Sequence, residues 1–345
     1  MGDVVISTAL IQDIVNAFPN AQIDINTLPP WDLLFKNDPR FSRIIAIDLH
    51  GKGKRFSGTL GLLRIIKKGC YDMIVDLQSN DRSQILLILF HLFFRRTPYR
   101  VGNHQRYPYN IFPKISPSTI LPAFEHQRLT IDAMGIATLN PRPVLYVNTV
   151  NRKQAETLLH KNSLQSGHFV IFLPGCDAHG RLKRWGITNY ARLAFHLHRK
   201  KGFYVVLIGA SDEQEECHAI QKLVDQPWLI NLCGQTAVQE IVPICKQSAA
   251  IVANDTGTAH IAACAPTPMV VICGPTNPHR VKPPGPNVIA IQAKLDCINC
   301  YCKKSCNHQS CMKRLSPEIV LQHLEKIMTH PEGIPPSEND FMIIC

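Results

Sequence analysis

The sequence lacks a hydrophobic run long enough to cross a membrane as a helix. Its most apolar stretch, residues 85–94, has ten residues, whereas a spanning helix needs about 20. The opening residues contain neither the basic segment nor the apolar core of a secretion signal, so we expect a cytoplasmic protein. Arg95 and Arg96 follow the apolar stretch and suit an anionic membrane surface, although a buried helix that ends in basic residues is the simpler interpretation.

Charged residues are scarce, at 18% of 345, and acidic ones are the scarcer kind: 26 Asp and Glu stand against 37 Lys and Arg, a net charge of +11. With 45% hydrophobic residues, this composition excludes a disordered chain or a coiled coil. The positive excess predicts anionic partners. Thirteen cysteines are too few for a disulfide-stapled domain of this length, and the number is odd, so we expect mostly reduced thiols.

Two motifs of other chemistries are missing. No Gly-x-Gly-x-x-Gly follows a predicted strand, which argues against a dinucleotide oxidoreductase. The triplet Asp255-Thr-Gly has no second copy, whereas an aspartic protease needs two carboxylates that share a proton.

Short apolar runs alternate with helical patterns, which is typical of βαβ units around a parallel sheet. The predicted fold class is therefore α/β. Strands are predicted over 43–47, 71–77, 168–173, 202–208, 249–253 and 268–273, and helices over 9–18 and 60–68.

The length predicts two domains. Prolines and weak periodicity between residues 117 and 151 indicate a junction near residue 150. We predict one domain over 1–150, a second over 151–329, and an irregular tail over 330–345. Strands of the second domain read as buried on both faces and end in small or polar loops, so this domain is the predicted nucleotide-binding one.

Residues 254–260 read Asn-Asp-Thr-Gly-Thr-Ala-His, after a predicted strand and before a small-residue helix. Free backbone N–H groups at such a helix start, with the Thr256 and Thr258 hydroxyls, suit a phosphate. The alternative is that Asp255 only caps the helix.

Two other predicted strands end in charged loops. Arg181, Lys183 and Arg184 suit a pyrophosphate, and Glu213 lies where ribose hydroxyls are commonly held. Taken alone, the three cations fit a solvent-exposed face equally well, and Glu213 fits an ordinary carboxylate in the first turn of a helix.

In their order, these motifs resemble the C-terminal half of the bacterial lipopolysaccharide heptosyltransferases, glycosyltransferase family 9. The likeness rests on Pro174-Gly175 with Lys183-Arg184-Trp185, on 209–213, on 254–260 and on 274–278. Residues 1–8, 18–24 and 71–78 are similar to the family's N-terminal motifs. The likeness extends from residue 2 to about residue 325.

The resemblance implies a GT-B architecture, in which an acceptor-binding and a donor-binding Rossmann-like domain face a cleft. It implies an inverting glycosyltransferase that moves L-glycero-D-manno-heptose from ADP-heptose to the inner core of lipopolysaccharide, closest to the heptosyltransferase II type. Asp3 would be the base that takes the acceptor's proton. A family member with another nucleotide sugar or acceptor is the alternative.

The resemblance also implies a donor site. Lys183 and the backbone of Thr256 and Gly257 would clamp the diphosphate. Glu213 would hold the ribose. Asp255 and His260 would line the site, and catalysis would require no metal or other cofactor.

Family members normally have a hydrophobic strand of about ten residues before the Gly-Asp motif. This sequence begins at Met1, directly before Gly2-Asp3. We therefore expect the first strand of the N-terminal sheet to be missing.

Residues 36–68 contain nine Lys or Arg and two Asp, a net charge of 9 − 2 = +7. Within them, Lys52, Lys54, Arg55 and Arg64 are predicted to bind the phosphates and carboxylates of a lipid A–Kdo acceptor and to favour peripheral contact with the inner membrane. A solvated helix face is the alternative.

Cysteines cluster near the end of the chain. The spacing of Cys297, Cys300, Cys306 and Cys311 suits a structural zinc or iron; reduced thiols that pack a loop are the alternative. A basic Cys-knuckle protein that binds nucleic acid is a further reading. The cluster lacks a second knuckle and interleaved aromatic residues, however, so no nucleic acid is expected.

Overall fold

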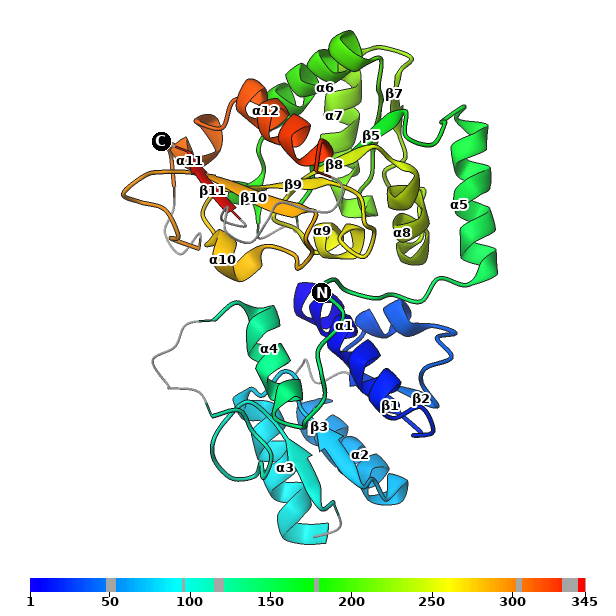
Figure 1. Ribbon diagram of the computed structural model, residues 1–345, viewed down its shortest axis with the longest axis vertical. Coiled ribbons are helices and arrows are strands. Elements are labelled where there is room, and N and C mark those ends of the chain that lie inside the picture. The colour runs from blue at the N-terminus through cyan, green and yellow to red at the C-terminus, as the bar shows by residue number, and fades with distance from the viewer. Residues whose placement is uncertain are drawn as a thin grey trace. The chain divides into compact units, whose positions relative to one another are not determined.

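The structure is a computed structural model. It describes residues 1–47, 54–94, 97–114, 121–176, 180–301, 306–330 and 341–344. The chain divides between Asn140 and Pro141 into two compact units (Figure 1).

The described strands of the first unit form two parallel pairs. β1 (Asp24–Thr27) pairs with β2 (Arg43–Ala46), and β3 (Met73–Val75) pairs with β4 (Tyr99–Val101). The other elements are α1 (Gly2–Ala17), the 3-10 helix η1 (Trp31–Phe35), α2 (Lys54–Gly69), α3 (Asp81–Phe94) and α4 (Ala123–Asp132). The predicted strands over 43–47 and 71–77 are confirmed as β2 and β3, and the predicted helices are α1 and α2.

One polar contact links these two strand pairs. Asp24, at the start of β1, accepts hydrogen bonds from Arg43 at 2.9 Å and from the Tyr71 hydroxyl at 2.5 Å. Burial and the neighbouring carboxylate raise the pKa of Tyr71 to about 12. Asp24 therefore fixes the start of β2 and the residues before β3 relative to β1.

The second unit contains a seven-stranded parallel sheet in the order β11-β10-β9-β8-β5-β6-β7. Its strands are β5 (Phe169–Leu173), β6 (Tyr204–Leu207), β7 (Leu229–Asn231), β8 (Ala250–Asn254), β9 (Met269–Cys273), β10 (Val288–Ala293) and β11 (Phe341–Ile344). The predicted runs over 168–173, 202–208, 249–253 and 268–273 are confirmed as β5, β6, β8 and β9. The tail is not irregular throughout, because the apolar residues 341–344 extend the sheet beside β10.

Helices cover both faces of this sheet (Figure 1). α6 (Ile187–Lys201), α7 (Gln214–Val224) and α12 (Pro317–Met328) pack on one face and share a core with β5, β8 and β9. The other face carries α8 (Val238–Gln247) and α9 (Gly257–Ala262), with α5 (Thr149–Lys161) packed on α8. The short helices are η2 (Arg181–Lys183), η3 (Ser211–Glu213), α10 (Pro278–Val281) and α11 (Ser310–Lys313).

Local sequence explains how two of these helices begin and end. Ser316 caps α12 by accepting a bond from the Ile319 N–H, and Pro317 occupies the first turn, where its missing N–H costs nothing. α6 ends at Gly202, whose φ of 69° suits a residue without a side chain. Among the residues that the structure describes, no helix has the length and apolarity that crossing a membrane takes.

Candidate active site

The strand order places a ligand-binding edge in the second unit. From β5 the chain proceeds to β6 and β7 on one side and then crosses to β8 on the other. In open parallel sheets, ligands bind at the carboxyl ends of strands where the order reverses in this way. The loops after β5 and β8, which carry the predicted motifs, lie at this reversal.

Lys183 and Asp255 meet at this edge. The Lys183 Nζ lies 2.9 Å from Asp255 Oδ2, and the Asp255 side chain is 7% exposed. The Thr276 hydroxyl, from the loop after β9, donates to the same oxygen at 2.8 Å. Three loops therefore hold one cation at a fixed position, with its side chain 26% exposed.

Asn254, the residue before Asp255, links these loops through hydrogen bonds of its side chain. Its Nδ2 donates to the carbonyl of Pro174, and its Oδ1 accepts from the Tyr190 hydroxyl at 3.1 Å and the Trp185 backbone N–H at 3.3 Å. The side chain is fully buried. An amide that both donates and accepts can satisfy all three segments at once, which explains why this position holds Asn.

Glu213 is buried against two glycines. Its Oε2 accepts from the Ala210 N–H at 2.7 Å, and a Cβ at Gly175 would lie 2.0 Å from its Oε1. A Cβ at Gly209 would lie 2.8 Å from Oε2. Glycine at both positions therefore lets the carboxylate sit between the loops after β5 and β6.

A second buried ion pair supports the same loops. Arg184 Nη1 lies 2.9 Å from Glu216 Oε2, while Nη2 donates to the Cys176 carbonyl at 3.1 Å. Burial outweighs the attraction of Arg184 and raises the pKa of Glu216 to about 7. Arg184 thus connects α7 to the loop after β5.

The helix start after β8 is at the predicted place. Thr256 is the N-cap of α9, with no bond from its own side chain, and Gly257 is the first helical residue. His260 is buried in this helix. Asp255 is therefore not the helix cap, because its carboxylate is held by Lys183 and Thr276.

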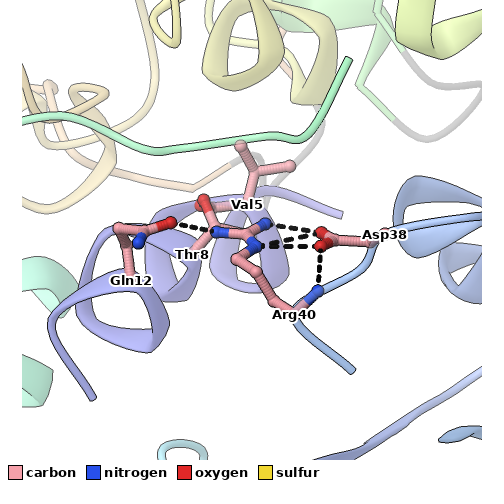
Figure 2. A network of polar contacts seen from close by, with 5 residues as sticks. All are labelled: Val5, Thr8, Gln12, Asp38 and Arg40. Atoms are coloured by element: carbon pink, nitrogen blue, oxygen red, sulfur yellow. Dashed lines mark hydrogen bonds and ion pairs between the residues drawn. The ribbon is translucent and has the colours of Figure 1, made fainter. Parts of the chain in front are cut away.

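Asp3, the predicted base, lies exposed in the first turn of α1 in the first unit. α1 is fixed by a polar network that Figure 2 shows. Arg40 donates to Asp38, at 2.6 Å from Nη2 to Oδ2, and to Gln12 of α1, at 2.9 Å from Nη1 to Oε1. The Asp38 side chain is 1% exposed, so this network ties the loop after η1 to the helix that carries Asp3.

The predicted acceptor residues are only partly described. Lys52 lies outside the described residues, and so do the side chains of Lys54 and Arg55 in α2. Arg64 is exposed on α2, together with Lys67 and Lys68. Two other basic residues of the 36–68 segment have carboxylate partners, because Arg40 pairs with Asp38 and Arg43 pairs with Asp24.

The predicted metal site needs correction. Among the described residues, no group of three or more His, Cys, Asp or Glu side chains could hold a metal ion. The described thiols of Cys297, Cys300, Cys306 and Cys311 therefore do not fit a structural zinc or iron.

The segment that contains these cysteines instead packs against the loop after β9. A Cβ at Gly274 would lie 2.9 Å from the Met312 side chain, and the Tyr301 N–H donates to the Pro275 carbonyl at 2.8 Å. This packing, by Met312 and the Tyr301 backbone, supports the loop that carries Thr276.

The structure brings some of the predicted residues together and adds two that the sequence did not indicate. Lys183 and Asp255 come together as one ion pair, and Glu213 lies at the same edge of the sheet. Thr276 and Glu216 were not predicted. Thr276 falls inside the 274–278 motif that carried part of the resemblance, whereas no local pattern indicates the partner of Glu216.

Comparisons with known proteins identify the family of this chain. The model of glycosyltransferase family 9 (heptosyltransferase) matches residues 60–311. The chain is 28% identical over 344 residues to lipooligosaccharide heptosyltransferase 2 of Haemophilus influenzae, covering 95% of this chain and 96% of that protein.

Solved structures show the same fold. A family 9 glycosyltransferase of Veillonella parvula matches with a TM-score of 0.80 at 19% identity, covering 96% of this chain and 95% of the other. The ADP-heptose lps heptosyltransferase II of Escherichia coli matches with a TM-score of 0.69 at 23% identity, covering 96% and 97%.

These matches place the chain in the GT-B fold class, so the predicted α/β GT-B fold is confirmed. The chain belongs to glycosyltransferase family 9, the heptosyltransferases.

Proposed function

We propose that this enzyme transfers L-glycero-D-manno-heptose from ADP-heptose to the inner core of lipopolysaccharide, with inversion at the anomeric carbon. Two matched proteins support the substrate class, since the relative from H. influenzae is named for lipooligosaccharide and the E. coli structure for ADP-heptose. The observation that carries the proposal is the Lys183 cation, paired with Asp255, whose carboxylate also accepts a bond from Thr276, where the strand order reverses.

Lys183 is assigned to the diphosphate of the donor. An ammonium group has three N–H donors, so it can bind Asp255 and a phosphate oxygen together. The start of α9 at Thr256 and Gly257 adds backbone N–H groups and the positive end of the helix dipole. These groups stabilise the negative charge that grows on ADP as it departs.

Glu213 is assigned to the ribose. A carboxylate accepts hydrogen bonds from hydroxyl groups such as those of ribose, and the Ala210 N–H that donates to Oε2 holds this one in place. Asp255 and His260 complete the donor site in this proposal.

Asp3 is assigned as the general base. It removes the proton of the acceptor hydroxyl while that oxygen bonds to the anomeric carbon and the bond from carbon to phosphate oxygen breaks. Attack opposite the departing ADP inverts the configuration. The basic residues Lys52, Lys54, Arg55 and Arg64 are assigned to the acceptor's anionic groups, and no metal or cofactor takes part. A cytoplasmic location stays a prediction.

Calorimetric titration with ADP-heptose, ADP-glucose and UDP-glucose tests the donor assignment. We expect ADP-heptose to bind most tightly and Lys183→Met to weaken it by about 10- to 100-fold, the loss of one charge-assisted hydrogen bond. Lys200→Met, an exposed cation at the end of α6, is the matched control and should leave the affinity unchanged. Tighter binding of UDP-glucose would favour a family member with another donor.

A further inference from the structure

α3 is apolar on the side that faces solvent as well as on the side that faces the core. Leu87 and Phe90 are buried, at 3% and 2% exposure. On the outer side, Ile85 is 56% exposed, Leu92 61% and Phe93 72%. A surface helix of a globular protein normally presents polar residues there.

These outward residues form one surface, which we call the α3 patch: Ile85, Leu92 and Phe93. Residues seven and eight positions apart lie on the same face of a helix, so Leu92 and Phe93 continue the face that Ile85 begins. Single exposed apolar residues are common, but a contiguous group marks an interaction site.

The helix that packs against α3 is basic on its exposed side. α2 packs against α3 through Leu62, Leu63 and Ile66, which share a buried cluster with Phe90. The exposed residues of α2 include Arg64, Lys67 and Lys68, and the helix contains no acidic residue. Exposed apolar residues on one helix and exposed cations on the helix packed against it suit an anionic phospholipid surface, where acyl chains accept the apolar side chains and headgroups accept the cations.

Tyr107 adds an amphipathic ring next to α3. Its ring meets that of His91 edge-on, with centroids 5.8 Å apart, and the residue is 48% exposed. Tyr is favoured at membrane interfaces because one end of its ring is apolar and the other is wet.

We propose that the α3 patch inserts into the boundary between headgroups and acyl chains of an anionic bilayer, with the basic residues of α2 against the headgroups. The biological role of this contact rests on the proposed function, since a lipid-anchored acceptor lies in such a surface. Binding to the bilayer itself requires no catalysis and no donor.

Co-sedimentation of the full chain with vesicles tests this surface. We expect binding to vesicles of phosphatidylethanolamine and phosphatidylglycerol, and at least 10-fold weaker binding to neutral phosphatidylcholine vesicles or at high salt. Leu92→Glu/Phe93→Glu and the uncharged Leu92→Ser/Phe93→Ser should each lower vesicle binding at least 10-fold.

Leu139→Glu/Leu223→Glu is the matched control, because Leu139 and Leu223 are 74% and 50% exposed and lie outside α3. It should bind vesicles like the parent. Equal binding by parent and Leu92→Ser/Phe93→Ser, or no binding by the parent, would overturn the proposal. So would a dimer of the parent in solution that the serine variant abolishes, because a second copy would then cover the α3 patch.

A separate readout distinguishes this proposal from the proposed function. With a deacylated, water-soluble acceptor, Leu92→Ser/Phe93→Ser should release ADP at the parent's rate. If neither protein releases ADP while only the parent binds vesicles, the proposed function fails and the membrane surface stands.

Discussion

Glu216 tests whether burial or the attraction of Arg184 determines the pKa of a buried carboxylate next to the proposed donor site. Its carboxylate lies 2.9 Å from Arg184, an arrangement that by itself would keep it ionised. Burial nevertheless raises its pKa from 4.5 to about 7. A pKa that is higher in the folded than in the unfolded chain stabilises the fold fully below pH 4.5, and this stabilisation is lost as pH rises through 7.

The size of the effect follows from the two pKa values. The difference between 4.5 and about 7 corresponds to at most about 3 kcal/mol of unfolding free energy. Water that reaches this pair, where the Arg184 side chain is 24% exposed, also hydrates the ionised Glu216 carboxylate and reduces the penalty of burial, so we expect about half of that figure. For a unit of this size, this corresponds to about 3–6 °C in Tm.

The assay is thermal unfolding of the parent and Glu216→Gln between pH 5 and 8. Glutamine resembles the protonated carboxyl and does not titrate, so the parent's Tm should fall relative to the variant's by about 3–6 °C as pH rises. Glu215→Gln, at the exposed neighbouring position, is the control and should show a constant difference. A parent that gains stability relative to Glu216→Gln with rising pH would refute the reasoning, because Arg184 would then dominate.

Two further predictions concern the frame of the site. Gly175→Ala places a Cβ 2.0 Å from Glu213 Oε1, so we expect ADP affinity by calorimetry to fall at least about 10-fold. Gly61→Ala, where no atom lies within 4 Å of the new Cβ, should leave it unchanged, and equal affinities in both variants would contradict the assigned role of Glu213. Trp185→Phe removes the indole N–H that donates to the Leu315 carbonyl at 2.6 Å and should lower the free energy of unfolding, measured in urea, by about 1–3 kcal/mol; an unchanged midpoint would contradict this.

Burial on both faces made several core strands predictable from the sequence, although β10, which is also buried throughout, was not predicted. β5, β8 and β9 are entirely buried, and such strands read as unbroken apolar runs. β1 is the polar tetrapeptide Asp-Ile-Asn-Thr and β7 has three residues. Neither is long and apolar enough to give a periodic signal. Each is recognised as a strand only by its pairing with a neighbouring strand.

The site could be predicted as a set of strand-end loops but not as a set of contacts. Lys183 and Asp255 stand 72 positions apart, yet each follows a strand of one parallel sheet, which brings them to the same edge. The partner of a buried side chain depends on how the loops fold back. The Thr276 bond to Asp255 and the pairing of Arg184 with Glu216 therefore emerge only from the structure.

The metal site predicted from the cysteine cluster was wrong for the same reason, because side-chain contacts do not follow from spacing. Spacing alone permits a tetrahedral site, but the direction of each thiol is set by the packing of its loop. Here Met312 packs against Gly274, and burial, with Cys306 and Cys300 nearby, raises the pKa of Cys311.

The proposed transfer of heptose from ADP-heptose to an acceptor activated by Asp3 can be measured as ADP release from ADP-heptose. The measurement is made with and without a lipid A–Kdo acceptor, in the parent and in Asp3→Asn. We expect release by the parent only when acceptor is present, and a loss of about 100-fold or more in Asp3→Asn with donor binding retained, as for removal of a general base. Release by Asp3→Asn at the parent's rate would contradict the account.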